Sequence, residues 1–162
     1  MTMAVDAFVR TYPCPALRVV PPEVPSGLRS FFDNLDRGVQ KWATQRVDDG
    51  GFLRYLEKAA FVTKRHERVA PRVSIGRAQS NDIVMTIGTV SKTHGYFTDE
   101  PTGWHFVDPY STNGSWVGGH RLGHRQPIRL EDGCLIRFGQ GTTLQFLLPP
   151  SLWEVARRPV DT

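Results

Sequence analysis

The second half of the chain alternates hydrophobic and polar residues with a period of two. From residue 61 onward, short alternating runs are separated about every 8 to 12 positions by Gly, Asn and Asp, the residues that tight turns favour. This pattern predicts strands at residues 61–64, 72–76, 83–87, 95–98, 104–108, 115–117, 127–130, 135–138 and 143–147. Short strands at this spacing are typical of a two-sheet antiparallel β-sandwich, so the predicted fold class is mainly β.

The N-terminal third has a helical period instead. After Ser26, a candidate N-cap, one helix face is formed by Leu28, Phe32, Leu35, Val39 and Trp42. The glycines of Asp48-Asp49-Gly50-Gly51 interrupt the pattern, and a second apolar face follows at Phe52, Tyr55, Leu56, Ala59 and Ala60. We therefore expect a helical hairpin over residues 26–60 as an N-terminal extension of the sandwich.

The two ends of the chain complete the predicted organisation. Residues 1–25 are rich in proline and contain one β-branched run, Leu17 to Val20, which predicts an extended arm that contributes an edge strand. After residue 149, Leu152, Trp153 and Val155 predict a short C-terminal helix that packs on the domain. The expected units are an arm at 1–25, a hairpin at 26–60, a sandwich at 61–149 and a terminal helix and tail at 150–162.

Composition narrows the class of protein. With 162 residues, 40% of them hydrophobic, the chain can build one domain with its own core plus an appendage. The formal net charge is +4, but no run of five or six like charges occurs, so we expect no nucleic-acid partner. No apolar segment has the length of a membrane span or the pattern of a signal peptide, which predicts a cytoplasmic protein with no membrane contact.

Several kinds of reactive site are disfavoured. The two cysteines, Cys14 and Cys134, are too few for a disulfide framework or a structural zinc site. His120 and His124 are four residues apart, but the glycines around them argue against the helix that such a metal pair needs. No paired carboxylates and no nucleophile with a base at workable spacing occur. We expect a protein that is not an enzyme and that holds no metal or cofactor.

Three stretches with polar chemistry remain, each at the boundary of a predicted strand. They are Ile75-Gly76-Arg77, Val90-Ser91-Lys92-Thr93-His94 and Ser111-Thr112-Asn113-Gly114. Each alone is common, because strands often end in arginine, serine often caps turns and Asn-Gly is a frequent turn dipeptide. Together with Asn81-Asp82-Ile83 and Leu130-Glu131-Asp132-Gly133, in this order, they resemble the forkhead-associated (FHA) domain over about residues 60–148.

The resemblance implies a function and a site. FHA domains bind phosphothreonine peptides through loops at one end of a sandwich. A phosphothreonine brings a charge of about −1.5 to −2 and three acceptor oxygens, so its receptor needs fixed donors and positive charge. The resemblance makes Arg77 the principal phosphate ligand, Ser91 a second donor and Lys92 an auxiliary charge. Thr112 and Asn113 would reach the phosphate and the peptide backbone.

The family also assigns supporting roles and reveals one departure. Gly76, His94 and Gly114 would hold the binding loops rather than touch the ligand. Cys134 stands where the family has an acidic residue in a structural turn. We expect this departure to change local stability rather than binding.

Strand counting alone does not bring the three loops together. In a plain up-and-down chain, the loops at 88–93 and 108–114 share an end, whereas the loop after Arg77 falls at the other. The predicted strand 83–87 spans at most about 17 Å, so Arg77 need not be far from Ser91. Convergence of all three loops is implied by the resemblance.

Two functions follow from these patterns. The first is a phosphothreonine-dependent module that recruits a phosphorylated partner in Ser/Thr kinase signalling, the partner being a kinase or its substrate. The alternative is a phosphate-independent scaffold or oligomerisation protein that uses the stripe of Phe32, Leu35, Val39 and Trp42. The sequence leaves the oligomeric state and the identity of the partner open.

Overall fold

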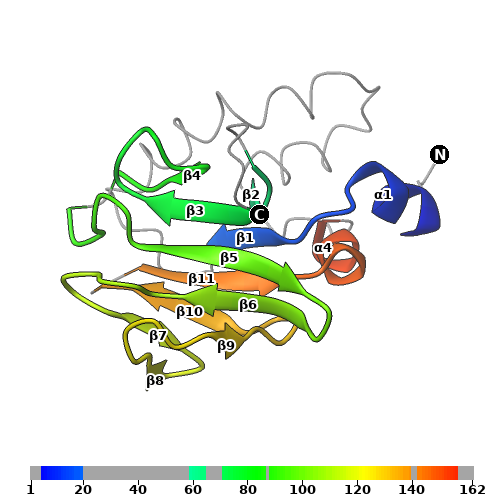
Figure 1. Cartoon of the computed structure of the whole chain (residues 1–162). Coiled ribbons are helices and arrows are strands. Elements are labelled where there is room, and N and C mark those ends of the chain that lie inside the picture. Colours follow the sequence, from blue (N-terminus) through cyan, green and yellow to red (C-terminus); the bar gives the residue numbers. More distant parts are fainter. Residues whose placement is uncertain (1–4, 20–58, 65–70, 87, 140–141, 157–162) are drawn as a thin grey trace, which may run out of the picture.

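The computed structural model describes most of the C-terminal two thirds of the chain and a short N-terminal segment (Figure 1). The described residues are 5–19, 59–64, 71–86, 88–139 and 142–156. The helical hairpin predicted for residues 26–60, and the scaffold function that depends on it, lie outside these ranges except for residues 59 and 60.

One sheet of the fold has six strands. Its spatial order is β2 (Ala59–Phe61), β1 (Ala16–Val19), β11 (Thr142–Leu147), β10 (Leu135–Phe138), β7 (Ser115–Val117) and β8 (His120–Arg121). All of its strand pairs are antiparallel.

The other sheet has five strands and packs against the first (Figure 1). Its spatial order is β4 (Ile83–Val84), β3 (Arg72–Gly76), β5 (Gly95–Glu100), β6 (Gly103–Val107) and β9 (Ile128–Arg129). The predicted mainly β, two-sheet sandwich is confirmed. Burial along β3 shows why the alternating pattern predicted the strands. Val73 and Ile75 are buried, whereas Arg72 is exposed and Ser74 is half-buried.

Aromatic side chains fill the space between the sheets. Phe97 of β5, Phe106 of β6 and Phe138 of β10 are fully buried, and neighbouring rings lie with centroids 5.0 and 5.4 Å apart. Burial of a phenylalanine stabilises a fold by about 1.5 to 3 kcal/mol relative to leaving it exposed. This core joins the two sheets and holds the strand ends that carry the loops.

The N-terminal segment is built into the fold, which corrects the prediction of an extended arm with an edge strand. Residues Val5–Thr11 form helix α1. Strand β1 lies inside the six-stranded sheet, paired with β11 on one side and β2 on the other. The short β-branched run was correctly read as a strand, but its place in the sheet depends on β2 and β11, which are distant in sequence.

A second hydrophobic cluster explains why α1 forms. Phe8 of α1 and Tyr12, which directly follows α1, pack with Phe61 and with Leu152 of helix α4 (Pro149–Ala156). Tyr12 stacks on Phe61 with ring centroids 5.5 Å apart. An isolated seven-residue helix is marginal in water, so α1 depends on this packing. The short C-terminal helix and its packing role are confirmed.

The end of the predicted hairpin and the first predicted strand also need correction. Residues 59 and 60, expected in a helix, belong to β2, and β2 ends at Phe61 rather than continuing to residue 64. Ala60 is buried opposite Leu17 of β1. Small residues fit both helix and sheet interiors, so tertiary pairing with β1 decides the conformation.

Strand β4 departs from the expected antiparallel pattern. It contains only Ile83 and Val84, and it pairs with β3 in parallel. Asp82 stabilises this parallel pairing. Its carboxylate accepts hydrogen bonds from the backbone N–H and the hydroxyl of Ser74, at 2.9 and 3.0 Å. The turn before β4 is thereby tied to the middle of β3, and the chain does not run up and down.

Smaller differences concern short strands. Strand β8 was not predicted, because a two-residue exposed strand leaves no alternating pattern. Strand β9 is limited to residues 128 and 129 of the predicted 127–130.

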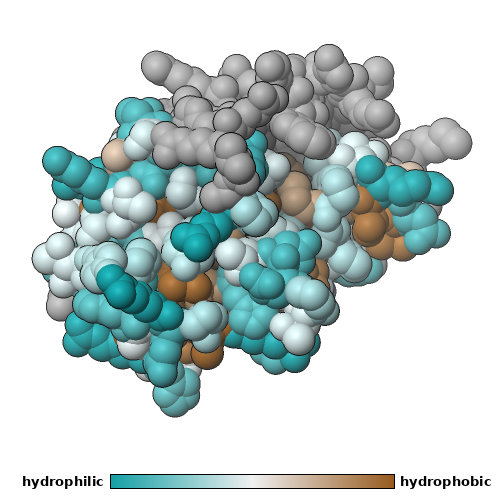
Figure 2. All heavy atoms as spheres, in the orientation of Figure 1, coloured by the Kyte–Doolittle hydropathy of each residue, from teal (hydrophilic) through white to brown (hydrophobic). Residues whose placement is uncertain are grey.

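Within the part of the chain that the structure describes, no helix is long and apolar enough to cross a membrane. Among the coloured residues of Figure 2, hydrophilic and intermediate ones cover most of the visible face, with a few hydrophobic patches between them.

Candidate functional site

The strand order brings the three polar loops to one end of the sandwich. β3 pairs directly with β5, so the end of β3 at Gly76 lies beside the start of β5 at Gly95. β6 pairs antiparallel with β5 and sets Val107 opposite Tyr96. The segment after β3, the loop before β5 and the loop after β6 therefore meet. The plain up-and-down model was wrong for Arg77 because β4 is not interposed between β3 and β5.

Backbone hydrogen bonds continue beyond β3 and fasten Arg77 to the next loop. The N–H of Arg77 donates to the carbonyl of Ser91 at 2.9 Å, and the N–H of Ala78 donates to the carbonyl of Lys92 at 3.0 Å. Arg77 and Ser91 are thus neighbours through the main chain. Their proximity does not depend on side-chain conformation.

Gly76 permits this close approach. A Cβ atom at Gly76 would lie 2.4 Å from the carbonyl oxygen of Lys92 and 2.9 Å from the backbone N of His94. Real Cβ atoms do not tolerate such distances, so only glycine fits between these two segments. The supporting role expected for Gly76 thereby has a steric basis.

The side chain of Arg77 is exposed and oriented by one hydrogen bond. Its Nε donates to the carbonyl of Val90 at 3.2 Å. A guanidinium has five N–H donors, so the two terminal amino groups stay available to a ligand. Within the described residues, neither Arg77 nor the exposed Lys92 forms an ion pair with a carboxylate. This part of the site therefore presents uncompensated positive charge.

Ser91 joins the loop before β5 to the loop after β6. Its Oγ accepts a hydrogen bond from the backbone N–H of Thr112 at 3.0 Å. Because that contact uses an oxygen lone pair, the hydroxyl proton of Ser91 stays available to donate to an anion. The side chain of Thr112 is exposed beside it.

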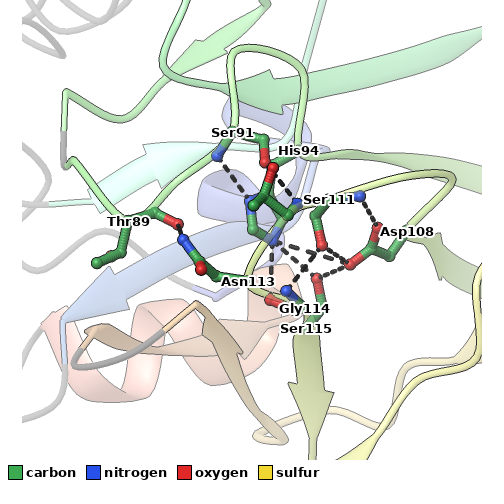
Figure 3. Close-up of polar contacts among 9 residues, drawn as sticks. Thr89, Ser91, His94, Asp108, Ser111, Asn113, Gly114 and Ser115 are labelled. Carbon is green, nitrogen blue, oxygen red and sulfur yellow. Dashed lines mark hydrogen bonds and ion pairs between the residues drawn. The ribbon is translucent and has the colours of Figure 1, made fainter.

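Asn113 makes a second link between the same loops (Figure 3). Its Nδ2 donates to the carbonyl of Thr89 at 2.8 Å, which fixes the plane of the amide. The second N–H of the amide and its Oδ1 remain for a ligand, so Asn113 can both donate and accept along an extended peptide. Thr89 was not singled out from the sequence, because a backbone acceptor leaves no residue-specific signal.

His94 is buried beneath these contacts and organises them (Figure 3). Its Nδ1 accepts from the backbone N–H of Ser91 at 3.1 Å. Its Nε2 lies 3.0 Å from both the carbonyl of Gly114 and Oγ of Ser115. A backbone N–H can only donate and a carbonyl can only accept, so the proton resides on Nε2.

The surroundings keep His94 neutral. Burial lowers the pKa of His94 from its ordinary value of 6.5, while the Asp108 carboxylate and the bond to the Gly114 carbonyl oppose part of that effect. The neutral ring is what the geometry requires, because protonation of Nδ1 would remove the acceptor for the Ser91 N–H.

Asp108 is the second buried anchor. It is 1% exposed and accepts hydrogen bonds from the backbone N–H of Ser111 at 2.8 Å and from Oγ of Ser115 at 2.6 Å. The Ser111 hydroxyl also donates to it and in turn accepts from the N–H of Gly114 at 3.0 Å. These bonds shape the turn that presents Thr112 and Asn113.

Gly114 closes that turn through its backbone conformation and its hydrogen bonds. Its φ is +86°, in the left-handed region that side chains disfavour. Its carbonyl accepts from His94 and from the N–H of Gly139, the latter at 2.8 Å. The expected structural roles of His94 and Gly114 therefore have a common network as their basis.

Three further residues support the loops, and the sequence patterns predicted no role for them. Asn81 is 2% exposed, and its Nδ2 donates to the carbonyls of Ala78 and Lys92 at 2.8 and 2.6 Å. Asp108 and Ser115 form the base of the network described above. The signal for Asp108 was present, since an aspartate three residues before a serine is typical of a side-chain-capped turn.

The chain is similar in sequence to a known family. A family model described as the FHA domain matches residues 73–139. The FHA-2 domain of an ABC transporter from Mycobacterium tuberculosis is 31% identical, over 49% of this chain and 71% of that domain, with a TM-score of 0.40. The chain belongs to the FHA-domain family. All three polar loops lie within the matched residues.

Two further structures resemble the chain. EmbR of Mycobacterium tuberculosis, solved with a low-affinity phosphopeptide, is 33% identical over 49% of this chain, with a TM-score of 0.44. This chain spans only 20% of the EmbR chain. The FHA domain of an Arabidopsis thaliana hypothetical protein is 17% identical, with a TM-score of 0.53, covering 85% of this chain and 87% of that one. No curated protein matches the chain in sequence.

Proposed function

We propose that this FHA domain binds phosphothreonine segments of a partner protein and so recruits that partner in Ser/Thr kinase signalling. The observation that carries the proposal is the junction of Arg77, Ser91 and the Thr112–Asn113 turn. Main-chain and side-chain bonds hold these groups together, and each keeps unused donors.

The chemistry of the junction suits a phosphate dianion. The terminal amino groups of Arg77 supply a planar pair of donors for two phosphate oxygens. The hydroxyl of Ser91 supplies a donor for a third oxygen, and Lys92 adds a mobile charge at the rim. Donors in place before the ligand arrives bind it at a lower entropic cost.

Asn113 and Thr112 bind the peptide part of the ligand in this proposal. An amide whose plane is fixed can hydrogen-bond the backbone of an extended peptide on the side next to the phosphothreonine. Asn113 would thereby set the register of the peptide, while Arg77 and Ser91 recognise the phosphate. EmbR, which is 33% identical over 49% of this chain, was solved in complex with a low-affinity phosphopeptide.

Calorimetry with a small peptide set tests this function. Each peptide is prepared with threonine, phosphothreonine or phosphoserine at the central position and titrated into the full chain. We expect micromolar affinity for selected phosphothreonine peptides and no measurable binding of the unphosphorylated ones. Equal affinity for phosphorylated and unphosphorylated peptides would contradict the proposal.

The kinase link is tested separately. Peptides that bind are aligned, and candidate Ser/Thr kinases are assayed for phosphorylation of the selected threonine. We expect the FHA domain to capture the kinase itself or its substrate only after phosphorylation. Capture that does not change on phosphatase treatment would contradict a role in kinase signalling.

A further inference from the structure

The outer face of the six-stranded sheet carries one tryptophan between two arginines. Cζ of Arg137 lies 4.0 Å from the ring centroid of Trp116, and Cζ of Arg121 lies 5.4 Å from it. The register pairs Trp116 of β7 with Arg137 of β10 on one side and with Arg121 of β8 on the other. These three residues are called the arginine–tryptophan row below.

The row faces away from the core. Ile136 and Phe138, on either side of Arg137 in β10, are fully buried between the sheets. Side chains of successive strand residues point to opposite faces, so Arg137 and its partner Trp116 lie on the outer face. Arg121 is exposed, and the other two are half-buried.

Both arginines have positive charge to offer a ligand. Within the described residues, neither Arg121 nor Arg137 forms an ion pair with a carboxylate. A guanidinium that lies over an aromatic ring keeps planar N–H donors, which match a carboxylate in a bidentate arrangement. Stacking on Trp116 also restricts the two long side chains, which lowers the entropic cost of engaging them.

The row begins at the edge of the phosphothreonine site. A Cβ atom built on Gly114 would lie 3.2 Å from Nε of Arg121 and 3.3 Å from Cη2 of Trp116. Gly114 directly follows Asn113, so Arg121 packs against the turn that presents Asn113 to the ligand. A bound segment that continues past this turn would meet Arg121 first and Arg137 next.

We propose that the arginine–tryptophan row binds an acidic segment of the same partner, outside the phosphothreonine itself. This inference rests on the proposed function, since the phosphothreonine anchors the segment. Both Cζ atoms lie over the same ring, 5.4 and 4.0 Å from its centroid, so the two guanidinium groups are at most about 9 Å apart. Side chains two positions apart lie on one side of an extended chain, about 7 Å from each other, so an alternating acidic segment engages both arginines.

A protein segment fits the row better than nucleic acid does. Proteins that bind single-stranded nucleic acid place successive bases on several aromatic side chains in a long basic groove. Here one aromatic residue and two arginines adjoin the proposed peptide-binding turn, and the chain contains no run of five or six basic residues. The continuity with Asn113 and Gly114 favours a peptide.

The test uses two pairs of phosphothreonine peptides, one pair with the tail before the phosphothreonine and one pair with the tail after it. Within each pair, one tail alternates Glu and Ser and the other alternates Gln and Ser. All four peptides are titrated into the wild-type chain and into R121Q/R137Q. The control is R72Q/R129Q, which removes the same charge from the five-stranded sheet, including the arginine whose Cζ lies 4.4 Å from the Tyr96 centroid.

We expect the acidic tail to tighten wild-type binding about three- to tenfold on one side of the phosphothreonine, the size expected for two partly exposed ion pairs. R121Q/R137Q should lose this advantage and bind the neutral-tailed peptide as the wild type does. The control should keep the advantage. Added salt should reduce the advantage in the wild type and in the control.

Other outcomes overturn the inference and separate it from the proposed function. If the neutral-tailed peptide binds but the acidic tail adds nothing in the wild type, the row is not an acidic-segment site although the phosphothreonine function stands. If none of the phosphopeptides binds, both proposals fail. If a short single-stranded oligonucleotide binds more tightly than the acidic-tailed peptide and R121Q/R137Q abolishes that binding, the ligand class is wrong.

Discussion

The backbone N–H of Thr112 donates a hydrogen bond to Oγ of Ser91 across 3.0 Å, and this contact ties the loop before β5 to the loop after β6. Ser91 therefore has two tasks in the proposed site. Its oxygen holds the Thr112–Asn113 turn, and its hydroxyl proton is available to the phosphate.

Replacement of this hydroxyl tests both tasks. Hydrogen bonds to charged groups contribute about 1.5 to 3 kcal/mol, so Ser91→Ala should weaken phosphothreonine-peptide binding about 10- to 100-fold. Calorimetry measures the affinity, and amide hydrogen exchange at Thr112 reports the loss of the loop contact. Unchanged affinity with faster exchange at Thr112 would show that Ser91 is structural only.

Gly76→Ala should destabilise the fold and weaken binding together. The new Cβ would lie 2.4 Å from the Lys92 carbonyl, and overpacking of this kind costs about 1 to 3 kcal/mol. Denaturant unfolding measures the cost. Gly88→Ala is the matched control, because a Cβ there meets nothing within 4 Å. Equal effects of the two substitutions would contradict the steric account of Gly76.

The state of His94 predicts how stability depends on pH. Burial lowers its folded pKa below 6.5, so the unfolded chain binds more protons just below pH 6.5. The free energy of unfolding should therefore fall as the pH drops from 6.5 toward the lower folded pKa, and its His94 contribution should be intact above 6.5.

The control for this pH dependence is His94→Asn. The variant should be less stable at pH 7.5, because the Ser91 N–H and the Gly114 carbonyl lose their buried partner. Its unfolding free energy should change less between pH 7.5 and 5.5 than that of the wild type. If the variant's unfolding free energy changes with pH as much as that of the wild type, a group other than His94 causes the pH dependence.

Cys134→Asp would restore the acidic residue that FHA domains have in this turn. Here the thiol is half-buried against the core, and burial, with Glu131 and Asp132 as minor causes, raises the pKa of Cys134 to about 11. A carboxylate in that place would be partly desolvated beside two others, so we expect a loss of about 1 to 2 kcal/mol with unchanged peptide affinity. A weaker peptide affinity at equal stability would contradict the purely structural role of the turn.

Local patterns predicted much of the sandwich. The strands with clear alternation, such as 72–76 and 135–138, were found with correct bounds, because burial of every second side chain leaves a readable signal. The interior place of β1 and the helix α1 were missed, since they depend on packing against Phe61 and Leu152. The same holds for Ala59 and Ala60.

Convergence of the site could be predicted only through the family resemblance. The sequence shows that Arg77, Ser91 and Asn113 lie at strand ends, but not that β3 pairs with β5 across a short parallel β4. The supports Asn81 and Asp108 bond mainly to backbone groups and neighbouring hydroxyls, which leave little trace in spacing.

The most direct test of the central claim is the contribution of Arg77 to phosphate-dependent binding. Calorimetry compares wild type, Arg77→Ala and Arg72→Ala, the last at the opposite end of β3, with one phosphothreonine peptide and its unphosphorylated form. Loss of charge-assisted bonds predicts about 30- to 100-fold weaker binding of the phosphopeptide by Arg77→Ala and wild-type affinity for Arg72→Ala. Phosphopeptide affinity that survives Arg77→Ala unchanged, in a folded variant, would contradict the account.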